Sequence, residues 1–145
     1  MQTIKQISIF AQNKPGQLER FTKVLAEGKI NILAISISST NGFGVIKLVV
    51  DKADLAYQKL KKSGFTVSQN QVLAIAMKDT PGGLYEVAKK LGKHKINVDN
   101  AYVFVRESRK TAYLIIEVED IERTIKLLKK DKLKFLKESE FSREK

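Results

Sequence analysis

The stretch Asn13-Lys14-Pro15-Gly16-Gln17-Leu18 decides the fold, because it returns 66 residues later as Asp79-Thr80-Pro81-Gly82-Gly83-Leu84. The same spacing relates Lys29-Ile30-Asn31-Ile32 to Lys95-Ile96-Asn97-Val98, and Leu48-Val49-Val50-Asp51 to Leu114-Ile115-Ile116-Glu117. Agreement in register over about half a repeat indicates a duplicated unit. The sequence therefore predicts two units, residues 1–70 and 71–145. Units of about 70 residues are marginally stable alone, so we expect them to share an interface.

The first unit has the alternation and the turn residues of six short elements. Strands are predicted over residues 4–11, 30–39, 45–50 and 65–67. Pro15 suits the first position of a helix that ends at Gly28. A second helix, which carries Leu55 and Leu60, ends at Gly64. Asn41-Gly42 is a strong signal for a hairpin turn. The predicted order is β-α-β-β-α-β.

The second unit repeats this order. Its strands are predicted over residues 72–77, 96–105, 111–118 and 133–136. One helix starts at Pro81 and ends at Gly92, and the other carries Ile121 and Leu128. No linker separates the units, so we expect one continuous sheet. The predicted fold class is α+β: a ferredoxin-like β-α-β-β-α-β unit repeated twice, with an antiparallel sheet and the helices packed on one face.

The net charge of +11 is spread over the whole chain. Residues 1–70 carry 10 basic and 4 acidic side chains and the remainder carry 17 and 12, so the halves net +6 and +5. Lysine dominates over arginine, which favours a solvated surface over bidentate recognition of phosphate. A polyanion or an acidic protein remains the alternative partner.

Catalytic and metal chemistry find little support in the sequence. There are no cysteines, which excludes disulfides and thiolate sites. The single histidine, His94, lies between two lysines and is interpreted as a solvated surface residue. We therefore expect no enzyme activity, no metal and no cofactor. No apolar run is long enough to span a membrane and the start lacks a signal-peptide pattern, so a cytoplasmic protein is expected.

The repeated polar residues lie at predicted junctions between strands and helices, where scaffolds usually place binding groups. A helix start presents unpaired N–H groups that suit a carboxylate. Gly16 and Gly82 let a ligand approach the backbone closely. Asn13 or Asp79 can receive an ammonium group, so one junction offers both halves of amino-acid recognition. A plain turn and helix-start signal is the alternative interpretation of each loop.

Both units resemble the ACT domain, a small amino-acid-sensing module of metabolic enzymes. The resemblance rests on the Asn/Asp-x-Pro-Gly-x-Leu loop and on the Ile-Asn-Ile/Val start of the second strand, and each motif occurs twice. It implies an amino acid bound in the seam between paired units, where the loop of one meets the strand start of the other. One implied site contains Asn13, Gly16 and Asn97, and the other contains Asp79, Gly82 and Asn31. Pro15 and Pro81 complete the implied ligand-binding set.

The resulting hypothesis is a regulatory protein that binds an amino acid and acts on a separate enzyme or transporter. A dedicated regulatory subunit of an amino-acid biosynthetic enzyme is the alternative. A homodimer is expected through the open sheet face, for which Phe10, Tyr102, Phe104 and Tyr113 are candidates. An RNA-recognition module shares the element order, but Val45 and Leu48 stand where it would need aromatic residues. Specific nucleic-acid binding is therefore not expected.

Overall fold

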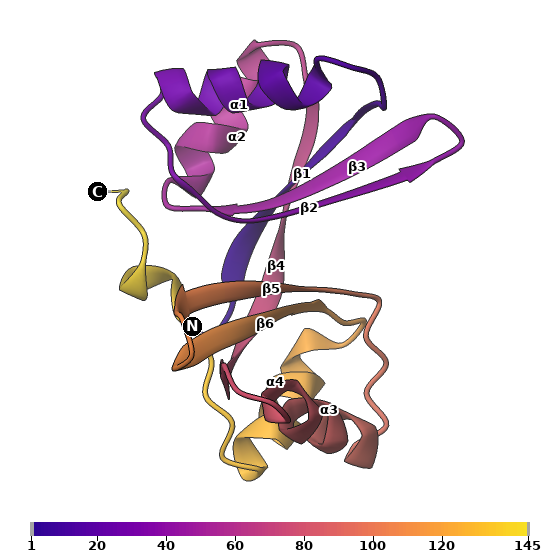
Figure 1. The fold of residues 1–145 in the computed structure, drawn as a ribbon, viewed down its shortest axis with the longest axis vertical. Helices are drawn as coiled ribbons and strands as arrows, with labels where there is room; N and C mark the ends of the chain where they lie inside the picture. Colours follow the sequence, from indigo (N-terminus) through magenta and orange to yellow (C-terminus); the bar gives the residue numbers. More distant parts are fainter. Residues whose placement is uncertain (1, 145) are drawn as a thin grey trace. The chain divides into compact units, whose positions relative to one another are not determined.

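The structure is a computed structural model that describes residues 2–144 (Figure 1). The chain divides into two compact units. The N-terminal unit comprises Lys5–Gln71 and the residues from Phe141 onward, and the C-terminal unit comprises Val72–Glu140 and the chain start up to Ile4. The elements are β1 (Ile4–Gln12), α1 (Gln17–Glu27), β2 (Ile32–Thr40), β3 (Phe43–Val50), α2 (Ala53–Lys62), β4 (Thr66–Lys78), α3 (Gly83–Lys93), β5 (Asn100–Glu107), β6 (Thr111–Glu117), α4 (Ile121–Lys130) and the short 3₁₀ helix η1 (Glu138–Glu140).

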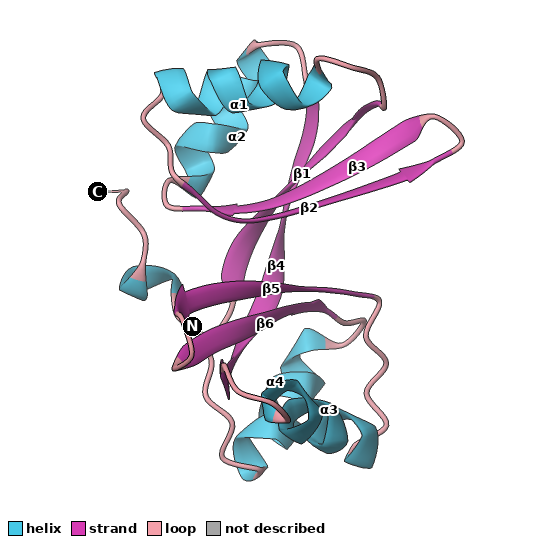
Figure 2. Ribbon diagram, viewed as in Figure 1, coloured by secondary structure: helices cyan, strands magenta, loops and turns pink. Residues whose placement is uncertain are grey.

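The N-terminal unit has strands in the order β2-β3-β1-β4, with α1 and α2 on one face (Figure 2). The strands β1, β2 and β3 pair antiparallel, and Ile7 and Ile9 of β1 lie opposite Leu48 and Ile46 of β3. Alternate residues point to the same face of a sheet, so these four side chains form the floor of the core. Phe21 from α1 packs on this floor and is fully buried. Burying a side chain of this size contributes about 1.5–3 kcal/mol.

The C-terminal unit repeats the pattern with strands in the order β4-β6-β5 and α3 and α4 on one face (Figure 2). Leu73 and Ile75 of β4 lie opposite Ile116 and Leu114 of β6, and all four belong to one buried cluster. Val87 of α3 packs against the same cluster. The predicted fold class is therefore confirmed: α+β, with two units of the β-α-β-β-α-β type and antiparallel strands.

Three predicted boundaries are wrong. Strands over 65–67 and 72–77 were predicted separately, but β4 runs unbroken from Thr66 to Lys78. Its middle residues, 68–71, are polar, and they continue the strand because strands pair through backbone groups and not through apolar side chains. The segment 133–136 forms only the isolated bridge between Ile75 and Phe135. The strand predicted from residue 96 begins at Asn100.

The predicted end of the third helix also needs correction. Gly92 lies inside α3, which continues to Lys93 and has His94 at its C-cap. The backbone turns at Lys95, which has a positive φ of 55°, just as Lys29 with φ of 56° follows the cap at Gly28. A left-handed residue after the cap ends a helix whether or not it is glycine. A glycine therefore marks the end of the helix correctly in the first unit, at Gly28, but not in the second, at Gly92.

Candidate functional site

The two Pro-Gly loops build the same turn in both units. Gly16 has φ 91° and ψ −13°, and Gly82 has φ 84° and ψ −7°. The amide of Gln17 donates to Lys14 O at 3.3 Å, and the amide of Gly83 donates to Thr80 O at 2.9 Å. Proline followed by a left-handed glycine matches a type II turn. The glycines are therefore the N-caps, and the expectation that proline occupies the first helical position is wrong: Pro15 and Pro81 precede the caps.

The helix starts after these turns lack side-chain caps. Neither α1 nor α3 has a side-chain hydrogen bond at its N-cap. Helical backbone bonding begins with the amide of Arg20 to Gly16 O and with that of Glu86 to Gly82 O. The two amides before each of these have no acceptor within residues 2–144. Free N–H groups at the positive end of a helix are suited to a carboxylate.

Asn13 and Asp79 tie each loop to the hairpin of its own unit. Asn13 Nδ2 donates to Ser39 Oγ at 3.0 Å, and its amide donates to Gly42 O at 2.8 Å. Asp79 Oδ2 accepts from the Arg109 amide at 2.6 Å. Both residues thus have a structural contact, as the turn interpretation required. Each side chain also has an Oδ1 atom, the amide oxygen in Asn13 and the other carboxylate oxygen in Asp79, that can accept a hydrogen bond from a ligand.

Asn31 lies between α1 and β2, and Asn97 lies at the matching place between α3 and β5. The Asn31 amide donates to Asp51 Oδ1 at 2.9 Å, which holds its backbone and leaves an exposed side chain. Asn97 lies in a loop before β5, and its Nδ2 donates to Asp99 Oδ1 at 3.1 Å. The implied grouping of Asn97 with Asn13 and of Asn31 with Asp79 stays a prediction.

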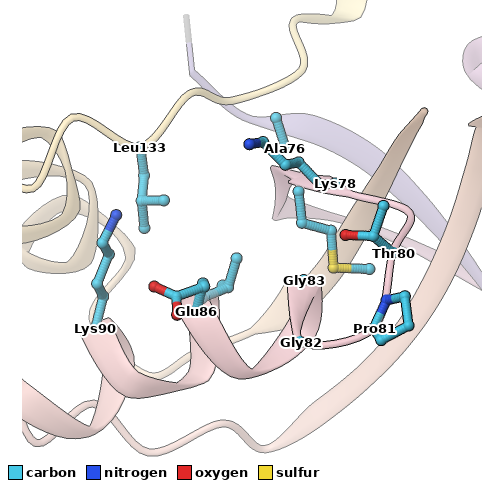
Figure 3. Close-up of a pocket in the computed structure, with 11 residues that line it drawn as sticks. Ala76, Lys78, Thr80, Pro81, Gly82, Gly83, Glu86, Lys90 and Leu133 are labelled. Carbon is cyan, nitrogen blue, oxygen red and sulfur yellow. The ribbon is translucent and has the colours of Figure 1, made fainter. Parts of the chain in front are cut away.

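A cavity opens beside each Pro-Gly loop. In the N-terminal unit it has a volume of about 250 Å³, and its lining includes Asn13, Pro15, Gly16, Phe21 and Ile37. In the C-terminal unit the volume is about 480 Å³ (Figure 3), and the lining comprises Ala76, Met77, Lys78, Thr80, Pro81, Gly82, Gly83, Glu86, Val87, Lys90 and Leu133. The proline and the glycine of the motif thus line both cavities. Of the two residues that begin the motif, Asn13 lines the cavity of its unit and Asp79 does not. In Asp79 one carboxylate oxygen, Oδ2, accepts from the Arg109 amide in the hairpin turn.

His94 is not the solvated residue that the sequence suggested. Its Nε2 lies 2.6 Å from Asp131 Oδ2, and only 15% of its side chain is exposed. Lys93 Nζ donates to Asp131 Oδ1 at 3.1 Å. The hydrogen bond from Lys93, and then that with His94, holds the pKa of Asp131 below its usual value. The cluster joins the ends of α3 and α4, a contact that sequence spacing alone did not reveal.

Metal binding and a membrane-spanning helix find no support in the described residues. In the part of the chain that the structure describes, no group of three or more His, Asp or Glu side chains can hold a metal ion. No described helix is long and apolar enough to cross a membrane. The candidate sites are the helix starts after the two Pro-Gly loops, because each lies beside a cavity.

Known proteins share this architecture. The family described as an ACT domain pair matches residues 2–144. A solved protein from Bacteroides thetaiotaomicron is 31% identical, with a TM-score of 0.89 over 99% of this chain and 98% of that chain. The regulatory subunit of aspartate kinase from Thermus thermophilus has the same fold at 17% identity and a TM-score of 0.62, over 87% of this chain and 91% of that chain. No curated protein matches. The chain belongs to the family of ACT domain pairs.

Proposed function

We propose that this protein binds an amino acid at its Pro-Gly loops and regulates a separate partner. One observation carries the proposal: the same left-handed glycine turn precedes an uncapped helix in both units, and each turn borders a cavity. Membership in the family of ACT domain pairs supports the same role. Solved proteins of this fold include a regulatory subunit of aspartate kinase.

The loop supplies complementary groups for the two charges of an α-amino acid. The ligand carboxylate accepts hydrogen bonds from free amides in the first turn of α1 or α3. The ammonium group donates to the Oδ1 atom of Asn13 or Asp79. Gly16 and Gly82 have open space where a Cβ would stand, so the ligand can lie against the backbone. Asn31 and Asn97 are proposed as further ligand contacts.

Regulation of a separate chain is proposed as the output of ligand binding. The loops present hydrogen-bond donors and acceptors but no activated nucleophile, so we propose a sensor without catalysis of its own. The protein in solution is proposed to be a homodimer. Phe10 and Phe43 are 40% and 60% exposed on neighbouring strands, and large exposed apolar side chains mark contact surfaces. Light scattering at micromolar concentration checks this, and a clean monomer mass would contradict it.

A thermal-shift screen of the twenty amino acids tests the central proposal. A ligand at 100 times its Kd stabilises the folded state by about 2.7 kcal/mol, which raises the Tm of a chain of this size by several degrees. Calorimetry then gives the Kd and the number of sites. Gly82→Ala is expected to weaken binding, because it introduces a side chain where the ligand approaches the backbone. If none of the twenty shifts the Tm, the amino-acid proposal is wrong.

A further inference from the structure

The two cavities share a loop but open on different flanks. In the N-terminal unit the cavity extends over Ile37 and Ile46 of β2 and β3. In the C-terminal unit it extends instead toward Lys90 of α3 and Leu133, in the segment after α4 (Figure 3). The counterparts of Lys90 and Leu133 in the N-terminal unit, Val24 and Phe65, do not line its cavity.

The residues that close this flank are identified by matching the units. Leu133 corresponds to Phe65, because the Leu133 amide donates to Leu128 O at 3.2 Å and the Phe65 amide donates to Leu60 O at 3.1 Å. Along the first helix, Glu86 and Val87 correspond to Arg20 and Phe21 at the repeat spacing of 66. Each pair occupies the same place in its unit.

In the N-terminal unit these residues are in contact. The Arg20 guanidinium lies 4.4 Å from the centre of the Phe65 ring, a favourable cation–π arrangement. Phe21 is fully buried and belongs to the same core cluster as Phe65. The C-terminal unit has Glu86 and Leu133 in place of Arg20 and Phe65, so it cannot form this cation–π contact. It also has Val87 in place of Phe21 and so lacks that aromatic ring. In the C-terminal unit Glu86 and Leu133 accordingly stand on opposite sides of an open cavity (Figure 3).

Lysine side chains outnumber carboxylates around the open cavity. Lys78 and Lys90 line it, where the N-terminal unit has Gln12 and Val24. An adjoining hollow of about 300 Å³ adds Lys132, Lys134 and also Lys110, which is paired with Glu107 at 3.0 Å. The carboxylate of Glu86 is paired with Lys89 at 3.4 Å. Within residues 2–144, neither Lys78 nor Lys90 has a carboxylate partner.

We propose that the cavity of the C-terminal unit holds an amino acid with an acidic side chain, while the matching flank of the N-terminal unit is closed by Arg20, Phe21 and Phe65. The inference rests on the proposed amino-acid function and names the ligand class and the unit. The α-carboxylate lies at the start of α3. The side chain extends over Val87 toward Lys78 and Lys90, which supply the opposite charge. One bound ligand per chain is expected.

Calorimetry with glutamate, aspartate, leucine and lysine tests this on the full chain. Glutamate or aspartate is expected to bind wild type with a stoichiometry near one. Glu86→Arg combined with Leu133→Phe rebuilds the closed flank with a pair that the N-terminal unit already uses, and binding is expected to be lost. Lys90→Val is expected to weaken binding of the acidic ligand at least tenfold, which is about 1.4 kcal/mol. Lys23→Val, which removes an exposed lysine from α1, is the matched control and leaves binding unchanged.

The outcomes separate the two proposals. If no amino acid binds wild type, the proposed function itself fails. If only neutral or basic amino acids bind, or if the rebuilt flank binds glutamate as wild type does, the ligand assignment fails and the function stands. If sodium phosphate stabilises the protein as well as glutamate does, the lysines form a general anion site and the assignment is wrong. Should the double variant not fold, Lys90→Val decides alone, because an unchanged affinity for the acidic ligand refutes the role of the lysine.

Discussion

Gly83→Ala probes how closely the backbone approaches the start of α3. A Cβ placed on Gly83 would lie 2.0 Å from Lys78 O and 3.1 Å from the Lys78 carbonyl carbon. Both are backbone atoms at the end of β4, so they cannot rotate away as a flexible side chain does. The glycine thus lets the last carbonyl of the strand sit against the helix start that the cavity borders. The corresponding residue in the N-terminal unit is Gln17, whose side chain is tolerated there.

The size of the effect follows from two opposing terms. Forcing an extra methyl group against packed atoms costs about 1–3 kcal/mol, and the upper part of this range applies when backbone must move. Alanine also favours a helix over glycine by about 1 kcal/mol. We therefore expect Gly83→Ala to lower the free energy of unfolding by about 1–2 kcal/mol. At the same position of α1, Gln17→Ala is expected to change it by no more than about 0.5 kcal/mol, as is usual for an exposed site.

Urea unfolding followed by circular dichroism measures both variants. The midpoint of Gly83→Ala should fall by roughly 0.5–1 M at an unchanged m-value. Because the shifted carbonyl also borders the cavity, ligand binding should weaken in the same variant. A Gly83→Ala protein as stable as wild type, or more stable, would show that helix propensity outweighs the contact and would refute the close approach.

Three further outcomes are expected. The pKa of Asp131 is held below its usual value, so this group stabilises the fold above about pH 4 and ceases to do so as the pH falls through its folded pKa. Between about pH 5 and pH 2, wild type should therefore lose more stability than Asp131→Asn, as measured by urea midpoints. Asp79→Ala removes the acceptor of the Arg109 amide, so hydrogen exchange of that amide should accelerate. An unchanged exchange rate would contradict the hydrogen bond between Asp79 and Arg109. For ligand binding, a double-mutant cycle should find Asp79→Ala coupled to Asn31→Ala, and strictly additive effects would disprove that they share a ligand.

Much of the fold could be predicted because repetition tests each assignment twice. The Asn41-Gly42 turn fixed one hairpin, and the repeat spacing then located the other. Boundaries failed where the deciding interaction was not local. β4 continues through the polar run 68–71, because its ladder is made by the backbone and not by side chains. Gly92 remained helical because the chain reverses three residues later at Lys95.

The candidate site was only partly predictable for a related reason. The loops were found from Pro15, Gly16 and their counterparts, since turn chemistry is written in adjacent residues. The open flank depends on residues 86 and 133, which are distant in the chain and become neighbours only after folding. Their significance emerges by comparison with Arg20 and Phe65, whose contact shows what the flank looks like when closed.

This contrast shows how a duplicated unit can diverge without losing its fold. The turn is set by backbone geometry, and both copies retain a left-handed glycine with φ values of 91° and 84°. The flank is set by side chains that leave strand pairing untouched, so it is free to change. Closing it with a ring and a guanidinium adds buried apolar area and a cation–π contact, which stabilise the N-terminal unit. Opening it gives up that stabilisation and creates space beside donors that were already in place. The binding capacity that we assign to the C-terminal unit is thus the counterpart of packing that the N-terminal unit retains.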